Sequence, residues 1–166
     1  MSIVDTLIQR HGLEPHPEGG WYKQTYKSTE LIAAETLPKR FGASRAFYTA
    51  IYFLLEKGNF SAFHRIKSDE LWHFYYGDTL EVLEIDENGK LKITDLGNKI
   101  EEGDVFQYTV KANTWFGSRV KAGGSFSLVG CTVAPGFDFR DFEMGDRRRL
   151  QTEFPELKEI ISTMTR

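Results

Sequence analysis

Cysteine is nearly absent from this sequence: Cys131 is the single one among 166 residues. A lone cysteine cannot form an intrachain disulfide bond, so the chain carries no mark of an oxidising compartment. No continuous apolar run has the length of a signal-peptide core or of a membrane-spanning helix. We therefore expect a cytoplasmic protein with no membrane partner. Cys131 lies in the apolar run SLVGCTV and is expected to be a small buried side chain.

An excess of positive charge is also missing. The formal net charge is -3, whereas a general nucleic-acid-binding surface needs a basic face. The one basic run is Arg147–Arg149, and Asp141, Glu143 and Asp146 lie close to it in sequence. We interpret this run as a solvated connection before the last helix rather than as a phosphate-binding site. The sequence therefore predicts no nucleic-acid partner.

The composition that remains is that of an ordinary globular protein. Hydrophobic residues make up 40% and charged residues 27% of the chain, which is not the composition of a disordered segment. The length suits one domain over residues 1–166, and neither an internal repeat nor a domain break interrupts it. The 13 Phe, 7 Tyr and 3 Trp indicate a β-rich core or, within it, an aromatic-lined pocket.

Short β-prone segments separated by turn signals occupy most of the chain. The pattern predicts strands at about residues 21–28, 46–55, 59–66, 70–76, 79–86, 90–96, 105–110, 113–120 and 125–133. Asn88 and Gly89 favour the hairpin turn whose twist matches paired strands, and Gly123 and Gly124 mark a second turn. Many short strands with regular turns predict an all-β sandwich or barrel.

The two ends of the chain have helical patterns. Ser2 can cap a short helix that ends at Gly12, which suits the left-handed conformation after a last helical turn. Pro155 suits the first turn of a second helix, and the apolar residues that follow it have helical spacing. Residues 29–45 have no clear pattern and are interpreted as a loop or lid.

The stretch GNFSAFHRIKSDELWHFYYG carries the most specific pattern in the chain. Five residues separate Gly58 from His64, and six separate Glu70 from Gly77. This spacing is similar to the first signature of the cupin superfamily, in which Gly, His-x-His, Glu and Gly follow one another at these intervals. Ile66 stands where that signature has its second His.

Other segments support the resemblance. A second cupin signature is matched in outline from Gly103 to Arg119, with Trp115 where the signature has a His. The segments PHPEGGW, SDELWHFYYGD and VAPGFDFRDFE resemble a family of small bacterial and fungal cupins that has no firmly assigned activity. The resemblance covers nearly the whole chain. It implies an all-β fold, a cupin jelly-roll barrel with short N-terminal and C-terminal helices.

The resemblance places the first signature inside the barrel, and the period of two along each strand decides which neighbours join it. His64 and Glu70 are the predicted catalytic residues, while His73 is predicted to face the other side of its strand. The predicted ligand-binding residues are Trp72, Phe74, Gln107 and Trp115. Such an interior suits a small organic ligand better than a metal ion. The alternative is that His64 and Glu70 only hydrogen-bond each other as a buried pair.

Metal-binding cupins typically use three His and one Glu, of which this chain keeps His64 and Glu70. We therefore predict no metal and no other cofactor. Metal-independent cupins similar to deoxysugar epimerases use a His base, a role that His64 would fill. The resemblance thus favours a sugar-like ligand and an isomerase or epimerase whose proton donor the sequence does not identify. The alternatives are a non-catalytic binding or sensing protein, and a metal-dependent cupin enzyme with an atypical ligand set.

Two further segments leave roles open. In PHPEGGW, His16 and Glu18 either close over the barrel mouth or belong to a rigid turn that aims Trp21 into the first strand. VAPGFDFRDFE is interpreted as a wrap of aromatic side chains over the end of the sandwich rather than as a cofactor motif. Cupins of this type commonly pair, and outward aromatic side chains such as Phe63 favour a symmetric partner. We expect a homodimer or an assembly of dimers.

Overall fold

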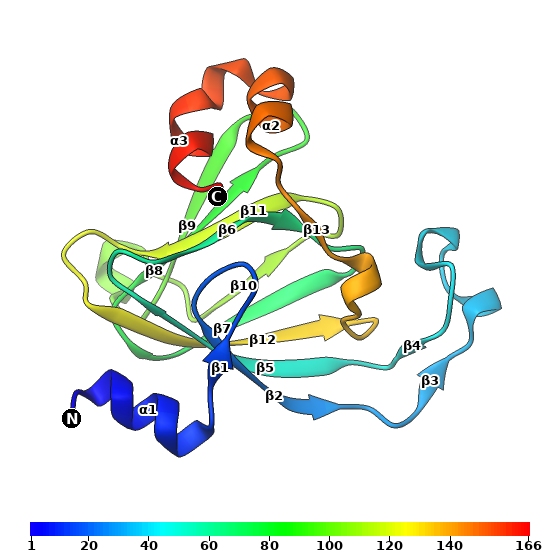
Figure 1. Ribbon diagram of the computed structural model, residues 1–166, viewed down its shortest axis with the longest axis horizontal. Helices are drawn as coiled ribbons and strands as arrows, with labels where there is room; N and C mark the ends of the chain where they lie inside the picture. The colour runs from blue at the N-terminus through cyan, green and yellow to red at the C-terminus, as the bar shows by residue number, and fades with distance from the viewer.

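Two antiparallel sheets packed face to face form the body of the computed structural model, which describes residues 1–166 (Figure 1). The six-stranded sheet contains, in spatial order, β1 (Glu14–Pro15), β2 (Trp21–Lys27), β5 (Thr49–Glu56), β12 (Phe126–Ala134), β7 (Asp69–Gly77) and β10 (Gln107–Val110). The five-stranded sheet contains β13 (Glu143–Met144), β6 (Phe60–Arg65), β11 (Trp115–Val120), β8 (Leu80–Ile85) and β9 (Leu91–Leu96). Neighbouring strands such as β5 and β12 are distant in sequence, which fits the jelly-roll fold.

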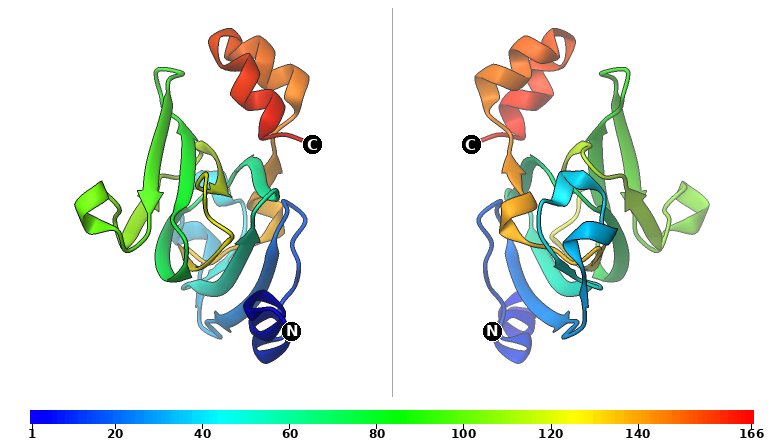
Figure 2. Two further views of the ribbon diagram at one scale, coloured as in Figure 1. Left: turned by 90° about the vertical axis from the view of Figure 1, so that its left-hand side faces the viewer. Right: turned by 90° about the vertical axis from the view of Figure 1, so that its right-hand side faces the viewer.

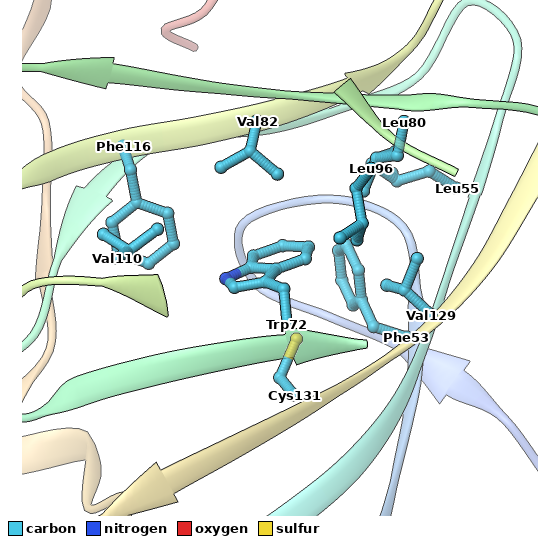
Figure 3. Close-up of a cluster of buried hydrophobic side chains, with 10 residues drawn as sticks. All are labelled: Phe53, Leu55, Trp72, Leu80, Val82, Leu96, Val110, Phe116, Val129 and Cys131. Carbon is cyan, nitrogen blue, oxygen red and sulfur yellow. The ribbon is translucent and has the colours of Figure 1, made fainter. Parts of the chain in front are cut away.

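The main core lies between the sheets, because alternate side chains of each strand point to the same face. Its buried members are Phe53, Leu55, Trp72, Leu80, Val82, Leu96, Val110, Phe116, Val129 and Cys131. Figure 3 shows the Trp72 ring in the middle of this cluster, with Phe116 to one side and Phe53 to the other. Both neighbouring rings meet Trp72 edge to face, at centroid distances of 6.0 and 6.2 Å. This packing of aromatic rings joins the two sheets across the core.

Helices cover the outer faces of both sheets and lie at opposite ends of the molecule (Figure 2). The N-terminal α1 (Ile3–His11) begins with a Ser2 capping box, ends at Gly12 and packs on the six-stranded sheet around Leu54 and Leu128. The C-terminal α2 (Arg147–Glu153) and α3 (Lys158–Thr163) pack on the five-stranded sheet. Single turns of 3-10 helix lie at Ala34–Thr36, Lys39–Phe41, Ile100–Glu102, Phe139–Asp141 and Pro155–Leu157.

The structure confirms the predicted strands within a few residues at their ends, and it corrects two local interpretations. Arg147–Arg149 are exposed, as predicted, but they form the first turn of α2 rather than a connection, and Arg147 donates to the Thr165 carbonyl oxygen at 2.6 Å. Phe63 is buried beneath the C-terminal helices of its own chain and so needs no partner to cover it. No helix is both long and apolar enough to cross a membrane.

The segment predicted as a loop, residues 29–45, contains its own small ribbon, in which β3 (Leu31–Ile32) pairs with β4 (Arg45–Ala46). At its end, the buried guanidinium of Arg45 forms a two-pronged ion pair with the buried carboxylate of Asp141. The segment is thereby tied to the chain that follows β12. This ion pair matters for function because the segment after β12 forms one wall of the cavity described next.

Candidate functional site

A cavity of about 410 Å³ lies between the sheets, next to the turn before β2 and the segment after β12. Its size falls in the range of about 300–1,000 Å³ that small-molecule sites usually occupy. The polar side chains that line it are Glu14, His16, Glu18, Lys23, Gln24, Thr49, His64 and Glu70. Apolar side chains supply the other half of the lining, so polar and hydrophobic groups contribute equally to the cavity wall.

The turn between β1 and β2 places Glu18 in the cavity. Gly19 and Gly20 have φ angles of 110° and 80°, a backbone region that side chains other than glycine rarely adopt. A Cβ atom on Gly19 would lie 2.1 Å from the carbonyl oxygen of Phe60, so the turn lies directly against β6. The amide of Ala62 then donates to the carbonyl oxygen of Glu18 at 2.9 Å. These constraints hold the Glu18 side chain over His64.

Glu18 and His64 form a buried pair. The Nε2 atom of His64 lies 3.0 Å from the Glu18 carboxylate, and Nδ1 lies 2.7 Å from the carbonyl oxygen of Ala62. Because a carbonyl oxygen can only accept, Nδ1 carries a proton, and the proton between Nε2 and Glu18 belongs to the pair. Burial opposes charge on both groups, yet their mutual attraction raises the pKa of His64 and lowers the pKa of Glu18. The favoured state is imidazolium beside carboxylate.

His16 lies on the other side of Glu18. Its Nδ1 accepts the backbone N–H of Glu18 at 3.2 Å, which requires that this nitrogen carry no proton. Burial lowers the pKa of His16, although the charge of Glu18 works in the opposite direction. His16 is therefore a neutral hydrogen-bonding member of the turn. Each of the two interpretations of PHPEGGW describes part of the structure: the glycines form a rigid turn, and His16 and Glu18 face the cavity.

Glu70 faces the same cavity from β7 but has a different environment. Its side chain is buried, and no N–H or O–H group of the protein donates to it; the thiol of Cys131 on β12 is its hydrogen-bonding neighbour. Burial raises the pKa of Glu70 to about 7, and the charge of Glu18 adds to this effect while His64 opposes it. Burial likewise raises the pKa of Cys131, so its thiol stays protonated. Near pH 7 both forms of the Glu70 carboxyl group are populated.

Three phenylalanines form one wall. Phe137, Phe139 and Phe142 come from the segment after β12 and pack edge to face, with the first two ring centroids 4.9 Å apart. Phe142 also stacks on His64 at 5.2 Å. The aromatic wrap predicted for VAPGFDFRDFE therefore closes the end of the sandwich and lines the cavity as well. Tyr22 adds an aromatic side chain from β2 and is the one tyrosine in the lining.

The structure brings only part of the predicted site together. His64 and Glu70 both line the cavity. Trp72 and Phe74 do share the inward face of β7 with Glu70, but they pack in and against the main core, away from the cavity lining. Figure 3 shows Trp72 enclosed by apolar side chains. The reason is their position along the strand, because each step of two residues along β7 moves the side chain about 7 Å further from the cavity.

Trp115 and Gln107 lie on outward faces instead. Phe116, one residue later, is the one that points inward, with its ring 4.2 Å from that of His64. Trp115 packs among the C-terminal helices. Its inward orientation was predicted wrongly because a one-residue error in matching a degenerate signature reverses the face of the strand to which a residue is assigned. Gln107 is exposed and hydrogen-bonds Nδ1 of His73 at 3.0 Å, on the outer side of the six-stranded sheet. We therefore remove these residues, with Trp72 and Phe74, from the candidate site.

The side chains present do not fit a cupin metal site. No group of three or more His, Cys, Asp or Glu side chains is arranged to hold a metal ion. Ile66 occupies the lining where the cupin signature has a His, and the Nε2 atom of His64 is directed at Glu18. No step below is therefore routed through a metal.

Glu18, Tyr22, Cys131 and the phenylalanine wall are the site residues that sequence reasoning did not assign. Glu18 had a partial signal, since it stands in a Pro/Gly-rich turn where a rigid backbone presents polar side chains. For Tyr22, the only signal in the sequence was the period of two along β2. The partnership of Glu18 with His64 spans 46 residues in sequence and follows from tertiary packing alone.

Comparisons with known proteins agree with this architecture. Residues 5–145 match the family model described as cupin superfamily (DUF985). A crystal structure of a protein from Shewanella oneidensis is 36% identical, with a TM-score of 0.88, over 100% of this chain and 99% of that one. A hypothetical protein from Leishmania major gives the same identity and TM-score over 97% of both chains.

More distant structures share the fold alone. Oxalate decarboxylase from Bacillus subtilis is 17% identical, with a TM-score of 0.54, over 90% of this chain and 36% of that one. No curated protein matches the sequence. The family match covers most of the chain, and the two structures at 36% identity cover nearly all of it. The chain therefore belongs to the DUF985 family of the cupin superfamily.

Proposed function

We propose that this protein binds a small, sugar-like organic molecule in the cavity and catalyses its metal-independent isomerisation or epimerisation. One observation carries the proposal. Two buried carboxyl groups, Glu18 and Glu70, face the same cavity, and their surroundings move their pKa values in opposite directions. A pair of acids separated in this way supplies one general base and one general acid at the same pH.

The geometry favours Glu18 rather than His64 as the base. Both ring nitrogens of His64 are engaged, Nδ1 by Ala62 and Nε2 by Glu18, so neither is free to take a proton from a ligand. The imidazolium of His64 instead keeps Glu18 ionised and fixes its orientation. His64 is thus a positioning residue, while Glu18 and Glu70 are the groups proposed to contact the reacting atoms.

The proposed reaction needs only these two carboxyl groups. Glu18 removes the proton from a carbon next to a carbonyl group, and Glu70 gives its proton to the carbonyl oxygen, so an enediol forms. For isomerisation, Glu18 then gives its proton to the former carbonyl carbon. The other hydroxyl group, on the carbon that lost its hydrogen, gives its proton to Glu70 and becomes the new carbonyl group. The reaction as written needs no oxidant, reductant or metal ion. General acid–base catalysis of this kind contributes about 10²–10⁴-fold for each well-placed group.

Exchange with deuterated water tests the proposal. We expect the wild-type protein to exchange the proton next to the carbonyl in at least one of a panel of free aldoses and ketoses, followed by NMR. Glu18→Gln should slow this exchange by about 10²–10⁴-fold, because the amide cannot accept the proton. His64→Ala should also lose it, since the Glu18 charge then has no partner.

His73→Ala is the matched control. His73 lies on the outer face of the six-stranded sheet, where its Nε2 is 3.1 Å from the Thr132 hydroxyl. We expect this variant to keep the exchange and to change only stability. Full exchange by Glu18→Gln, or loss of exchange by His73→Ala at unchanged stability, would contradict the assigned site.

A non-catalytic binding or sensing protein is the second candidate. It is favoured by the buried ion pair of Glu18 and His64, which satisfies both groups without any ligand. Such a protein would bind members of the panel in calorimetry, with affinity reduced by His64→Ala, and would leave every carbon-bound proton unexchanged. The same experiment therefore separates the two candidates.

We also propose that the chain forms a homodimer and acts in the cytoplasm. Aromatic side chains lie exposed on the outer side of the six-stranded sheet, among them Tyr75 at 51% and Tyr76 at 53%. A symmetric partner would cover them. Light scattering at micromolar concentration should give twice the 19.1 kDa chain mass, and Tyr75→Asp should lower it towards the monomer. A monomer mass for the wild type would refute the dimer.

A further inference from the structure

The charges around the cavity are unevenly distributed. Lys23 is the only lysine or arginine in the lining, and it is exposed at the rim, where exposed Glu14 accompanies it. Deeper inside, the positive charge of His64 is already paired with Glu18 at 3.0 Å. The pKa of His16 is lowered by burial, so this ring adds no charge. The interior therefore offers no free cation to an anionic ligand.

Glu70 is the one interior charged group that the protein leaves without a strong partner. Its side chain is 8% exposed and reaches the cavity, and a thiol is its only hydrogen-bonding neighbour. A ligand that supplies the hydrogen bond missing from the protein is therefore favoured at this carboxyl group. A protonated carboxyl group can donate such a bond to an oxygen atom.

We propose that the cavity selects an uncharged ligand, one that presents a carbonyl or hydroxyl oxygen to Glu70 and an apolar C–H face to the wall formed by Phe137, Phe139 and Phe142. The ligand class is free, uncharged sugars or polyols. Carboxylates and phosphates are excluded. This inference rests on the proposed function, since it concerns the same cavity and the same acid.

Electrostatics gives the exclusion its physical basis. A carboxylate or phosphate in the cavity would lose its hydration and lie near Glu18 and Glu70 without a free positive partner. Its approach would also favour protonation of Glu70, but a single proton cannot compensate both carboxyl groups. An uncharged sugar avoids this cost, and its C–H faces pack on the phenylalanine rings. A nucleotide-linked sugar would bring two phosphates and is excluded on the same ground.

Matched pairs of sugars provide the test. Calorimetric titration would compare glucose with glucuronate and galactose with galacturonate at about pH 6 and about pH 8.5, on either side of the Glu70 titration. We expect an uncharged member to bind at least about tenfold more tightly than its uronate, the effect of one well-placed charge or hydrogen bond. That uncharged sugar should also bind more weakly at the higher pH, where Glu70 can no longer donate.

Glu70→Gln isolates the acid, because its amide does not titrate but can still donate to an oxygen. We expect this variant to lose the pH dependence of sugar binding and to bind the uronates better than the wild type does. The groups that face Glu70 from the surrounding elements, His64, Glu18 and Cys131, are unchanged. Glu87→Gln, the same change at an exposed turn, should behave as the wild type.

The outcomes separate the two proposals. Uronates that bind as tightly as their uncharged partners would overturn the exclusion of anions and leave ligand binding in the cavity standing. Sugar binding that keeps its pH dependence in Glu70→Gln would overturn the role of Glu70. If no member of either class binds the wild type, the proposed sugar-like ligand fails, and the inference fails with it.

Discussion

Replacing Arg45 by methionine is expected to lower the free energy of unfolding by about 3–5 kcal/mol, because it removes both hydrogen bonds of the ion pair from a buried carboxylate. Arg45 is 3% exposed and Asp141 is 6% exposed. Nε and Nη2 of Arg45 donate to the two carboxylate oxygens at 2.7 and 2.6 Å. The remaining N–H groups donate to the carbonyl oxygens of Phe41, Ala43 and Ser44. All five donors are thus satisfied, and the mutation leaves Asp141 with only the longer contact to the half-exposed Lys67, whose Nζ lies 3.5 Å from the carboxylate.

Urea unfolding measures this effect, with the midpoint compared at an unchanged slope. Lys111→Met is the matched control, since it breaks an exposed ion pair with Asp69 at 3.0 Å and should cost less than about 1 kcal/mol. The double variant Arg45→Met/Asp141→Leu removes both charges and should recover part of the loss. If Arg45→Met costs no more than Lys111→Met, the pair does not anchor the segment after β12.

This anchor also links stability to the candidate site. Asp141 stands between Phe139 and Phe142 in sequence, and both of these side chains line the cavity. Arg45 therefore holds the phenylalanine wall from a segment that makes no contribution to the cavity itself. In the sequence, residues 29–45 showed no strand or helix pattern, because a two-residue ribbon and a buried ion pair leave no periodic trace.

The fold was predictable because its signals are local and repeated. Alternation along strands, hairpin turns such as Asn88-Gly89, and the spacing around His64 and Glu70 all indicate the same barrel. The inward orientation of His64 and Glu70 followed from the resemblance to the first cupin signature, which places these two residues inside the barrel. Helix α2 escaped prediction because three arginines give no apolar stripe, and its single buried residue, Leu150, is too little to mark a helix.

The rest of the site depends on contacts between distant parts of the chain. Glu18 meets His64 only because the turn before β2 hydrogen-bonds the backbone of β6 at Ala62. The sequence around Trp115 matches the second signature too loosely to decide its register. Phe116 faces the main core, while the adjacent Trp115 faces outward. The direction in which the pKa of Glu70 moves likewise depends on burial that no local pattern records.

Glu70→Gln is expected to stabilise the protein by up to about 3 kcal/mol above about pH 8 and to leave its stability unchanged below about pH 4. Burial raises the pKa of Glu70 from its ordinary 4.5 to about 7. Between these values the folded state holds a proton that the unfolded state releases, so wild-type stability falls as pH rises through this window. The difference of about 2.5 pH units, at about 1.4 kcal/mol per unit, sets the size of the effect. Glutamine has the shape of the protonated acid but no charge to bury.

Urea unfolding of both proteins from about pH 4 to about pH 9 checks this prediction, because only the difference between the two curves reports Glu70. His64 and Glu18 titrate in both proteins, so most of their contribution cancels. Glu87→Gln makes the same chemical change at an exposed turn, and its curve should follow the wild type throughout. A stability difference between Glu70→Gln and the wild type that does not vary with pH would show that folding leaves the pKa of Glu70 at its ordinary value, so that the group is ionised near pH 7. The acid of the proposed mechanism would then lack its proton, and Glu70 could serve only as a second carboxylate beside Glu18.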